Sequence, residues 1–187
     1  MRPFLFSLFA LTTFSALAAD PQLGSSTFVA GVGGAFPVAG YSTSAFHNGP
    51  SFVGEYELGF HKYVAATFGA ENYLLPFDNY SRYDTYSTRE RVTLMPFGLR
   101  GILPIADGRA ELFAGTGGAY LWTSQYYLRR SFDGSNFLWH LNGGAGIALD
   151  RAKHFRLGPT VRYYRDPGRP TQQWLSLSAD FSYRSGR

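Results

Sequence analysis

The stretch that decides the fold is Gln172-Gln-Trp-Leu-Ser-Leu-Ser-Ala-Asp-Phe-Ser-Tyr-Arg184. From residue 175 onward, apolar and polar side chains alternate without interruption. One face would carry Leu175, Leu177, Ala179, Phe181 and Tyr183, and the other Ser176, Ser178, Asp180, Ser182 and Arg184. A period of two predicts a β-strand, because successive side chains of a strand point to opposite sides of the sheet. This strand would separate an apolar environment from a polar one, and the rest of the chain has to indicate which lies inside.

The composition differs from that of an ordinary water-soluble protein. Aromatic residues make up 18% of the 187 residues, whereas charged residues make up only 16%. An average soluble domain has roughly 25% charged residues. The formal net charge of +4 is too small to indicate a nucleic-acid partner. The chain contains no cysteine, which excludes disulfides and a lipid anchor on cysteine.

The N-terminal segment has the pattern of a secretory signal peptide. Arg2 supplies the positive charge, residues 4–17 form an apolar stretch, and Ala16-Leu17-Ala18 matches a cleavage site. We therefore expect a signal peptide at 1–18 and an exported domain at 19–187. No later apolar run approaches the ~18 residues that a membrane-spanning helix needs. An exported chain of this kind would have to cross a membrane as strands.

Eight segments, the quoted stretch included, combine alternation with many aromatic residues. They are 25–36, 52–60, 64–75, 92–103, 110–122, 137–149, 154–164 and 173–184. Three connections are short (61–63, 104–109 and 150–153), and the four between them are longer and polar (37–51, 76–91, 123–136 and 165–172). Short turns at one end and long loops at the other are typical of a barrel inserted into a membrane from one side. We predict an all-β fold, an eight-stranded antiparallel up-and-down transmembrane β-barrel.

Polar and small residues share one face of these segments, and two arrangements fit that pattern. If the polar face met water, the apolar face would line a lipocalin-like cavity; if the polar face lay inside, the apolar face would meet lipid. The sorted connections favour lipid outside, as do segment lengths above the ~9 to 11 residues of a tilted spanning strand and aromatic residues near segment ends. We therefore predict an inward polar face whose opposite charges pair. The predicted lumen network is Glu55, Glu57, Glu71, Arg100, Glu111, His140, Arg156, Arg162 and Asp180.

Two prolines conflict with a closed barrel. Pro96 and Pro159 fall inside the fourth and seventh segments, and a closed barrel has no edge strand on which proline is tolerated without cost. Either β-bulges at these points or shifted strand boundaries would resolve the conflict.

The eight segments, the sorted connections, the leader at 1–18 and the last strand resemble the small eight-stranded outer-membrane β-barrel family. This family includes the OmpA transmembrane domain, OmpX and the opacity proteins. The resemblance covers 19–187 and implies a monomer in the cell outer membrane, in contact with lipid and lipopolysaccharide and inserted by the barrel-assembly machinery. The family's last strand usually ends on an aromatic residue, whereas here Arg184-Ser-Gly-Arg187 follows Tyr183. Phe181 or Tyr183 would have to serve as the insertion signal.

Motifs for catalysis and cofactor binding are weak. The glycine clusters at 31–34 and 115–118 lack the third glycine and the following helix of a nucleotide-binding loop, and the four histidines are not at metal-ligand spacing. A triad could be drawn from the polar face, with the members His140, Ser176 or Ser178, and Asp180. Lipid acyl chains would not reach inward-facing residues, however. We predict no catalytic residue, no metal and no cofactor.

The second predicted loop, 76–91, concentrates tyrosine and arginine. Its candidate contact residues are Tyr80, Arg82, Tyr83, Tyr86 and Arg89. Recognition surfaces are enriched in these residue types, which favours a host or glycan surface ligand. An aromatic girdle at the membrane interface, with arginines on lipopolysaccharide phosphates, explains the same residues equally well.

From the sequence we predict a non-enzymatic outer-membrane barrel with a plugged polar lumen. Its role would be structural in the envelope, or surface contact through the long loops. Eight strands enclose little more than their own side chains, whereas open channels have about 16 strands. Two alternatives stay open, a lipid-modifying outer-membrane enzyme and a narrow channel for small solutes.

Overall fold

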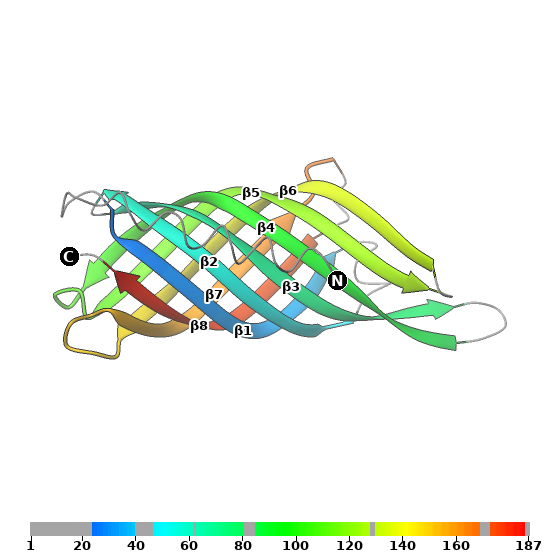
Figure 1. Cartoon of the computed structure of the whole chain (residues 1–187), viewed down its shortest axis with the longest axis horizontal. Helices are drawn as coiled ribbons and strands as arrows, with labels where there is room; N and C mark the ends of the chain where they lie inside the picture. The colour runs from blue at the N-terminus through cyan, green and yellow to red at the C-terminus, as the bar shows by residue number, and fades with distance from the viewer. Residues whose placement is uncertain are drawn as a thin grey trace.

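The computed structural model describes residues 24–39, 47–61, 63–80, 85–127, 130–168 and 173–185, and nearly all of them lie in eight strands (Figure 1). The strands are β1 (Ser26–Ala39), β2 (Gly49–His61), β3 (Val64–Tyr80), β4 (Thr85–Ile105), β5 (Ala110–Tyr127), β6 (Arg130–Ala148), β7 (Phe155–Arg165) and β8 (Gln173–Ser185). The predicted signal peptide at 1–18 lies outside the described residues. Within the described ranges, no helix is long and apolar enough to cross a membrane.

The sheet closes into a barrel. Each strand pairs in antiparallel orientation with the next along the chain, and β1 also pairs with β8. The cross-strand pairs can be followed once around the barrel, starting at Phe155 on β7. The path returns to β7 at Arg165, so one circuit displaces the register by 165 − 155 = 10 residues, which is the stagger of the barrel. Such a stagger goes with strands strongly tilted against the barrel axis, as Figure 1 shows. The predicted eight-stranded antiparallel up-and-down barrel is confirmed.

The two faces of the sheet have opposite chemistry. On β8, Leu177 is 46% exposed, whereas its neighbours Ser176 and Ser178 are 0% and 7% exposed. The same alternation runs around the barrel: large apolar side chains such as Leu103 and Ile147 lie outside, and polar side chains are buried inside. The described barrel therefore has an apolar exterior and a lumen that holds polar and charged residues.

Two of the predicted long loops are mostly strand. β3 continues to Tyr80 and β4 begins at Thr85, with their last pair at Tyr80 and Thr85, so only 81–84 connect them. β5 and β6 likewise pair up to Tyr127 and Arg130. The prediction of loops at 76–91 and 123–136 was wrong. These hairpins project beyond the rest of the wall (Figure 1), where neither face needs apolar residues, so the alternation fades although the backbone pairing continues.

The interior prolines are accommodated without bulges or shifted boundaries. The pairing of β3 with β4 is interrupted at Pro96 and continues beyond it in the same register. The pairing of β6 with β7 is interrupted at Pro159 in the same way. Proline lacks the N–H group that the ladder needs, so each one interrupts the ladder on one side only. The register shifts lie elsewhere, between Pro37 and Ala39 and between Gly59 and His61.

The turn between β4 and β5 is held by a neighbouring turn. Ala106 and Asp107 have left-handed backbone angles (φ 51° and 55°), and the amide of Gly108 donates to the carbonyl of Ile105 at 3.0 Å. Gly108 continues the left-handed backbone (φ 76°), so the four-residue turn curls back to the paired Ile105 and Ala110. The ammonium of Lys153, from the turn between β6 and β7, donates to the carbonyl of Asp107. This contact connects the two turns at the short-turn end of the barrel.

Candidate functional site

The polar part of the lumen begins at the short-turn end, with an ion-pair group around Glu111. Arg156 and Arg184 approach the Glu111 carboxylate at 3.1 and 3.2 Å. Arg184 Nε also donates to Thr27 Oγ1 at 3.2 Å, and Arg156 Nη2 to the carbonyl of Gly108 at 3.0 Å. β5, β7, β8 and β1 are thereby connected across the lumen.

A second ion-pair group lies around Arg100. Glu55 and Glu57 are two residues apart on β2 and therefore point the same way. Both carboxylates contact the Arg100 guanidinium, which lies 2.6 Å from Glu55. The guanidinium also lies over the Phe113 ring, 4.5 Å from its centroid. All three charged side chains are buried, and mutual pairing offsets the cost of removing them from water.

A third group lies nearer the hairpin end and combines charge with hydroxyl groups. Arg162 donates to Ser178 Oγ at 2.6 Å and to Asp180 at 2.5 Å, and Ser178 Oγ donates to the same carboxylate at 2.6 Å. The Glu71 carboxylate accepts hydrogen bonds from Tyr164 and Ser176 at 2.7 and 2.6 Å. Each buried carboxylate of this group therefore has a donor.

The structure does not connect His140, Ser178 and Asp180 as a catalytic triad. Such a triad needs the hydroxyl to donate to the imidazole and the imidazole to donate to the carboxylate. His140 Nε2 instead lies 3.3 Å from the carbonyl of Phe97, and Ser178 is bonded directly to Asp180. Across the described residues, no group of three or more metal-ligating side chains is present.

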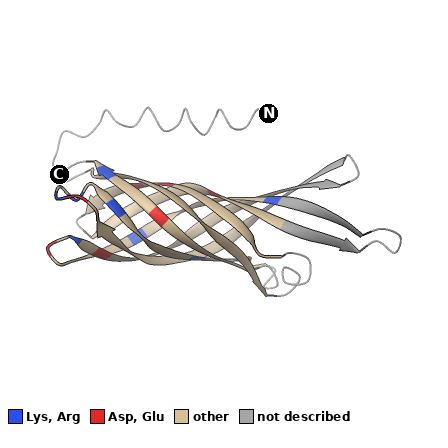
Figure 2. Cartoon of the chain, turned by 90° about the horizontal axis from the view of Figure 1, so that it is seen from below, with Lys and Arg blue, Asp and Glu red and all other residues tan. Residues whose placement is uncertain are grey.

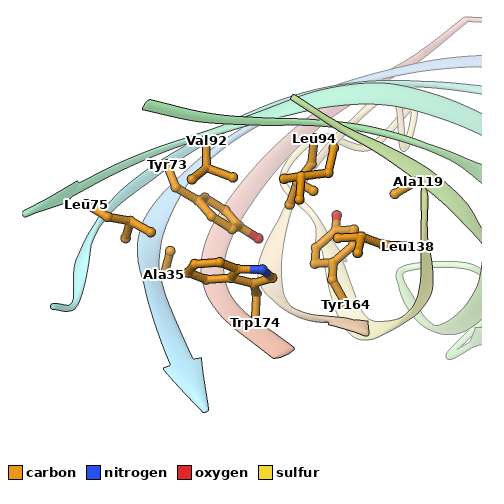
Figure 3. Close-up of a cluster of buried hydrophobic side chains, with 10 residues drawn as sticks. Ala35, Tyr73, Leu75, Val92, Leu94, Ala119, Leu138, Tyr164 and Trp174 are labelled. Carbon is orange, nitrogen blue, oxygen red and sulfur yellow. The ribbon is translucent and has the colours of Figure 1, made fainter. Parts of the chain in front are cut away.

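Above the polar groups, toward the projecting hairpins, the lumen is filled by an apolar cluster (Figure 3). Its members are Ala35, Tyr73, Leu75, Val92, Leu94, Ala119, Leu121, Leu138, Tyr164 and Trp174. Most of them are completely buried, and the Tyr73 and Trp174 rings lie 6.4 Å apart. Sequence reasoning missed this apolar cluster. The available signal was adjacent bulky apolar residues, as in Leu74-Leu75 and Leu121-Trp122, which must place one side chain on each face.

All nine residues of the predicted lumen network are buried inside the barrel. Arg162 pairs with Asp180, and Glu71 is held by hydroxyl groups. Arg184, which the predicted network omitted, contributes a fourth arginine. Along the described strands, charged residues are few and widely spaced (Figure 2).

The predicted loop-contact residues occupy the projecting hairpin. Tyr80 ends β3, and Tyr86 and Arg89 lie on β4, at the positions paired with Asn79 and Pro76. Their side chains lie outside the described part of the structure, as do Arg82 and Tyr83 altogether.

No sequence profile of a known family and no curated protein matches the chain. Solved structures match it in fold. Ail from Yersinia pestis, in complex with the heparin analogue sucrose octasulfate, has 12% identity and a TM-score of 0.61 over 87% of this chain and 99% of Ail. Neisserial surface protein A has 12% identity and a TM-score of 0.62 over 84% of this chain and 96% of its own.

OprG from Pseudomonas aeruginosa has 8% identity and a TM-score of 0.63, over 89% of this chain and 98% of OprG. The chain has the fold of the small eight-stranded outer-membrane barrels. At these identities the likeness concerns the outer-membrane barrel fold alone. The match nevertheless extends over 96 to 99% of the length of these solved barrels.

Proposed function

We propose that the protein is a non-enzymatic outer-membrane barrel with a closed lumen. It would serve envelope structure or surface contact through its projecting β3–β4 and β5–β6 hairpins. The observation that carries this proposal is the reversal of polarity: charged side chains are buried in the lumen, and large apolar side chains cover the outside.

The exterior supports insertion into lipid. Leu103 and Ile147 are 59% and 63% exposed, and similar residues follow on every strand. A water-soluble protein rarely exposes a continuous apolar surface of this extent, whereas a spanning barrel needs an apolar band around its wall. In a barrel inserted from one side, the short turns face the periplasm and the hairpins face outward.

The lumen contents support closure rather than conduction. The ion-pair groups occupy the short-turn half, and the apolar cluster around Tyr73, Leu138 and Trp174 occupies the hairpin half. A conducting path would have to displace both layers. Paired buried charges hold their positions because breaking one pair leaves an uncompensated charge.

The hairpins support a surface-contact role. They extend β3 to β6 well beyond β7, which has 11 residues against 17 to 21 in those strands. Their tips are rich in tyrosine and arginine, and guanidinium groups bind sulfate, phosphate or carboxylate in a bidentate manner. Ail, which shares the fold, was solved with a heparin analogue bound. We propose an anionic glycan as the ligand class.

Density-gradient separation of membranes and planar-bilayer recording test this function. We expect the protein in the outer-membrane fraction, with a folded form that migrates differently from the heated one. Purified protein in a planar bilayer should show no steady conductance. A steady conductance in wild-type protein would refute the closed lumen and favour a channel for small solutes.

A further inference from the structure

We infer that the sequence motif Ala-Gly-x-Gly-Gly-Ala-aromatic, present at 30–36 and again at 114–120, provides a seat for a short polar side chain of a neighbouring strand. A seat here is the space that a lumen-facing glycine leaves over its own backbone. In the first copy the seat is Gly31 and its occupant is Asp180, so the motif holds the closing seam between β1 and β8. The inference goes beyond the proposed function, which requires a closed lumen but no particular contact at the seam.

The Asp180 carboxylate lies directly over Gly31. The two residues are paired across the seam, and both are buried on the lumen side. A Cβ atom on residue 31 would lie 2.1 Å from Oδ1 and 3.0 Å from Cγ of Asp180, and Cβ atoms essentially never approach another heavy atom more closely than 3.0 Å. Any residue larger than glycine at this position would therefore push the carboxylate away.

The backbone of Gly31 gives no other reason for a glycine. Among the described glycines, only Gly24 and Gly108 have the positive φ that favours this residue type. A glycine inside a strand weakens the strand, and it marks a place where another group comes close to the backbone. Room for Asp180 is therefore what distinguishes glycine from alanine at position 31.

The seat places Asp180 within reach of two donors. Its Oδ1, the atom nearest to Gly31, accepts a hydrogen bond from Ser178 Oγ at 2.6 Å, and its Oδ2 accepts one from Arg162 at 2.5 Å. A carboxylate displaced by a side chain at position 31 would lose this geometry and leave a buried arginine without its ion pair. Gly31 on β1 thus supports an ion pair between β7 and β8, although β1 and β7 are not neighbours.

The second copy of the motif has a similar arrangement. Gly115 on β5 is paired with Asn142 on β6, and a Cβ atom on Gly115 would lie 2.7 Å from Asn142 Oδ1. Asparagine and aspartate have the same shape, and both occupants are 8% exposed. The two seats therefore receive the same kind of short, planar, polar side chain. They differ in direction, because Asn142 belongs to the strand that follows in the chain, whereas Asp180 belongs to the last strand.

The next glycine of the motif also has the same contact in both copies. A Cβ atom on Gly33 would lie 1.9 Å from the carbonyl oxygen of Leu177, and a Cβ atom on Gly117 would lie 2.0 Å from the carbonyl oxygen of Phe97. The first glycine thus makes room for a neighbouring side chain, and the second makes room for a neighbouring backbone. Matching contacts at two positions of two distant strands indicate that the repeat has one structural task.

Gly31→Ala tests the seat, because Asp180 supplies the two nearest atoms and the third, the carbonyl oxygen of Ala179, is 3.4 Å away. We expect the urea midpoint of unfolding in lipid vesicles to fall. Gly54→Ala is the matched control, because Gly54 lies opposite Ala30 on the exposed exterior and a methyl group there meets no heavy atom within 4 Å. Its midpoint should stay the same or rise, since alanine restricts the unfolded chain. Equal midpoints in the two variants would overturn the proposal.

Variants of Asp180 show whether this loss comes from the seat. Asp180→Ala empties the seat, so a further Gly31→Ala should no longer lower the midpoint. Asp180→Asn keeps the shape of the occupant, so Gly31→Ala should still lower it. If Asp180→Ala does not fold, Asp180→Ser replaces it, because serine lacks the Oδ1 atom over residue 31 and keeps a hydroxyl group for Arg162. An unchanged loss from Gly31→Ala in the emptied background would place the clash elsewhere and refute the seat.

Hydrogen exchange of the backbone amides tests the seam itself. Local opening accelerates exchange in the strands that open. In Gly31→Ala we expect faster exchange in β1 and β8 than in the wild-type protein, whereas β4 and β5 should change less. An equal acceleration in all strands would show that the contact does not hold this seam in particular and would overturn the role assigned to it.

Discussion

At the scale of single residues, Arg162 shows why the lumen charges come in sets. It is 2% exposed and contacts both Ser178 and Asp180. Arg162→Leu would leave the Asp180 carboxylate buried with one donor fewer, and removing one partner of a buried ion pair costs about 3 to 5 kcal/mol. We expect a lower free energy of unfolding, measured by urea titration in lipid vesicles.

Arg165→Leu is the control, since Arg165 lies three residues away on β7 and is exposed. Arg165 ends β7, and replacing a lipid-facing arginine near the end of a spanning strand should change the free energy of unfolding by no more than about 1 kcal/mol. Equal losses in the two variants would mean that the lumen pairing adds nothing to stability.

The orientation of the wall can be tested at Leu177. Its side chain is 46% exposed on the barrel exterior, so acyl chains should cover it in lipid vesicles. A water-soluble thiol reagent should therefore modify Leu177→Cys slowly. Arg151→Cys, in the exposed turn between β6 and β7, should react rapidly. If both cysteines react at the same rate, the exterior does not lie in lipid.

At the scale of elements, the projecting hairpins are separable from the wall. Asp78 pairs with Ser87, so replacing 79–86 with Asn-Gly closes the hairpin in its own register. We expect a barrel that still shifts in gel mobility on heating but has lost most binding to immobilised heparin in surface plasmon resonance. This result would assign the ligand to the β3–β4 hairpin.

Shortening the other hairpin gives the comparison. Tyr126 pairs with Ser131, so replacing 127–130 with Asn-Gly leaves β3 and β4 unchanged. This variant should retain heparin binding. Undiminished heparin binding in both variants would show that the hairpins are not the contact surface. A β3–β4 variant that no longer folds would show that the barrel wall needs this hairpin.

How closely a strand could be predicted from the sequence differs from one element to the next. β8 could be predicted closely because it lies between an apolar exterior and a polar lumen over most of its length. β3 and β4 could not, since their ends leave that environment and lose the alternation. The inward-facing Leu138 and Trp174 sit on the same face as the charged residues, so face assignment alone could not reveal an apolar layer. The contact of Glu111 with Arg184 depends on closure of the sheet between residues 73 positions apart, which no local pattern encodes.

At the scale of the whole molecule, an aromatic row winds once around the outside. The row that defines the stagger passes through Phe155, Tyr183, Phe28, Tyr56, Phe68, Phe97, Gly118 and Trp139. Seven of these eight positions are aromatic. Ring centroids along the row lie 4.9 Å apart at Phe28 and Tyr56 and 5.1 Å apart at Tyr56 and Phe68.

The one gap in the row is covered by its neighbours. A side chain on Gly118 would lie 2.5 Å from the ring of Phe137 and 2.8 Å from that of Phe97, so both rings cover this position. Cross-strand aromatic pairs stabilise one register against its alternatives, and a one-residue slip would turn every side chain to the wrong face. The row therefore helps to fix the stagger, and with it which charges meet in the lumen.

Phe68→Ala tests this role against Phe52→Ala. Both phenylalanines lie on the exterior, where Phe68 is 52% exposed and Phe52 is 46% exposed. Each variant therefore loses a similar lipid-facing area. Only Phe68 belongs to the row, where its ring contacts Tyr56, and aromatic pairs contribute about 0.5 to 1.5 kcal/mol beyond area. We expect Phe68→Ala to lose more free energy of unfolding than Phe52→Ala and to refold more slowly into vesicles, followed by gel mobility. If the two variants lose the same free energy of unfolding and refold at the same rate, the row is ordinary lipid-facing surface, because only a register-setting contact distinguishes Phe68 from Phe52.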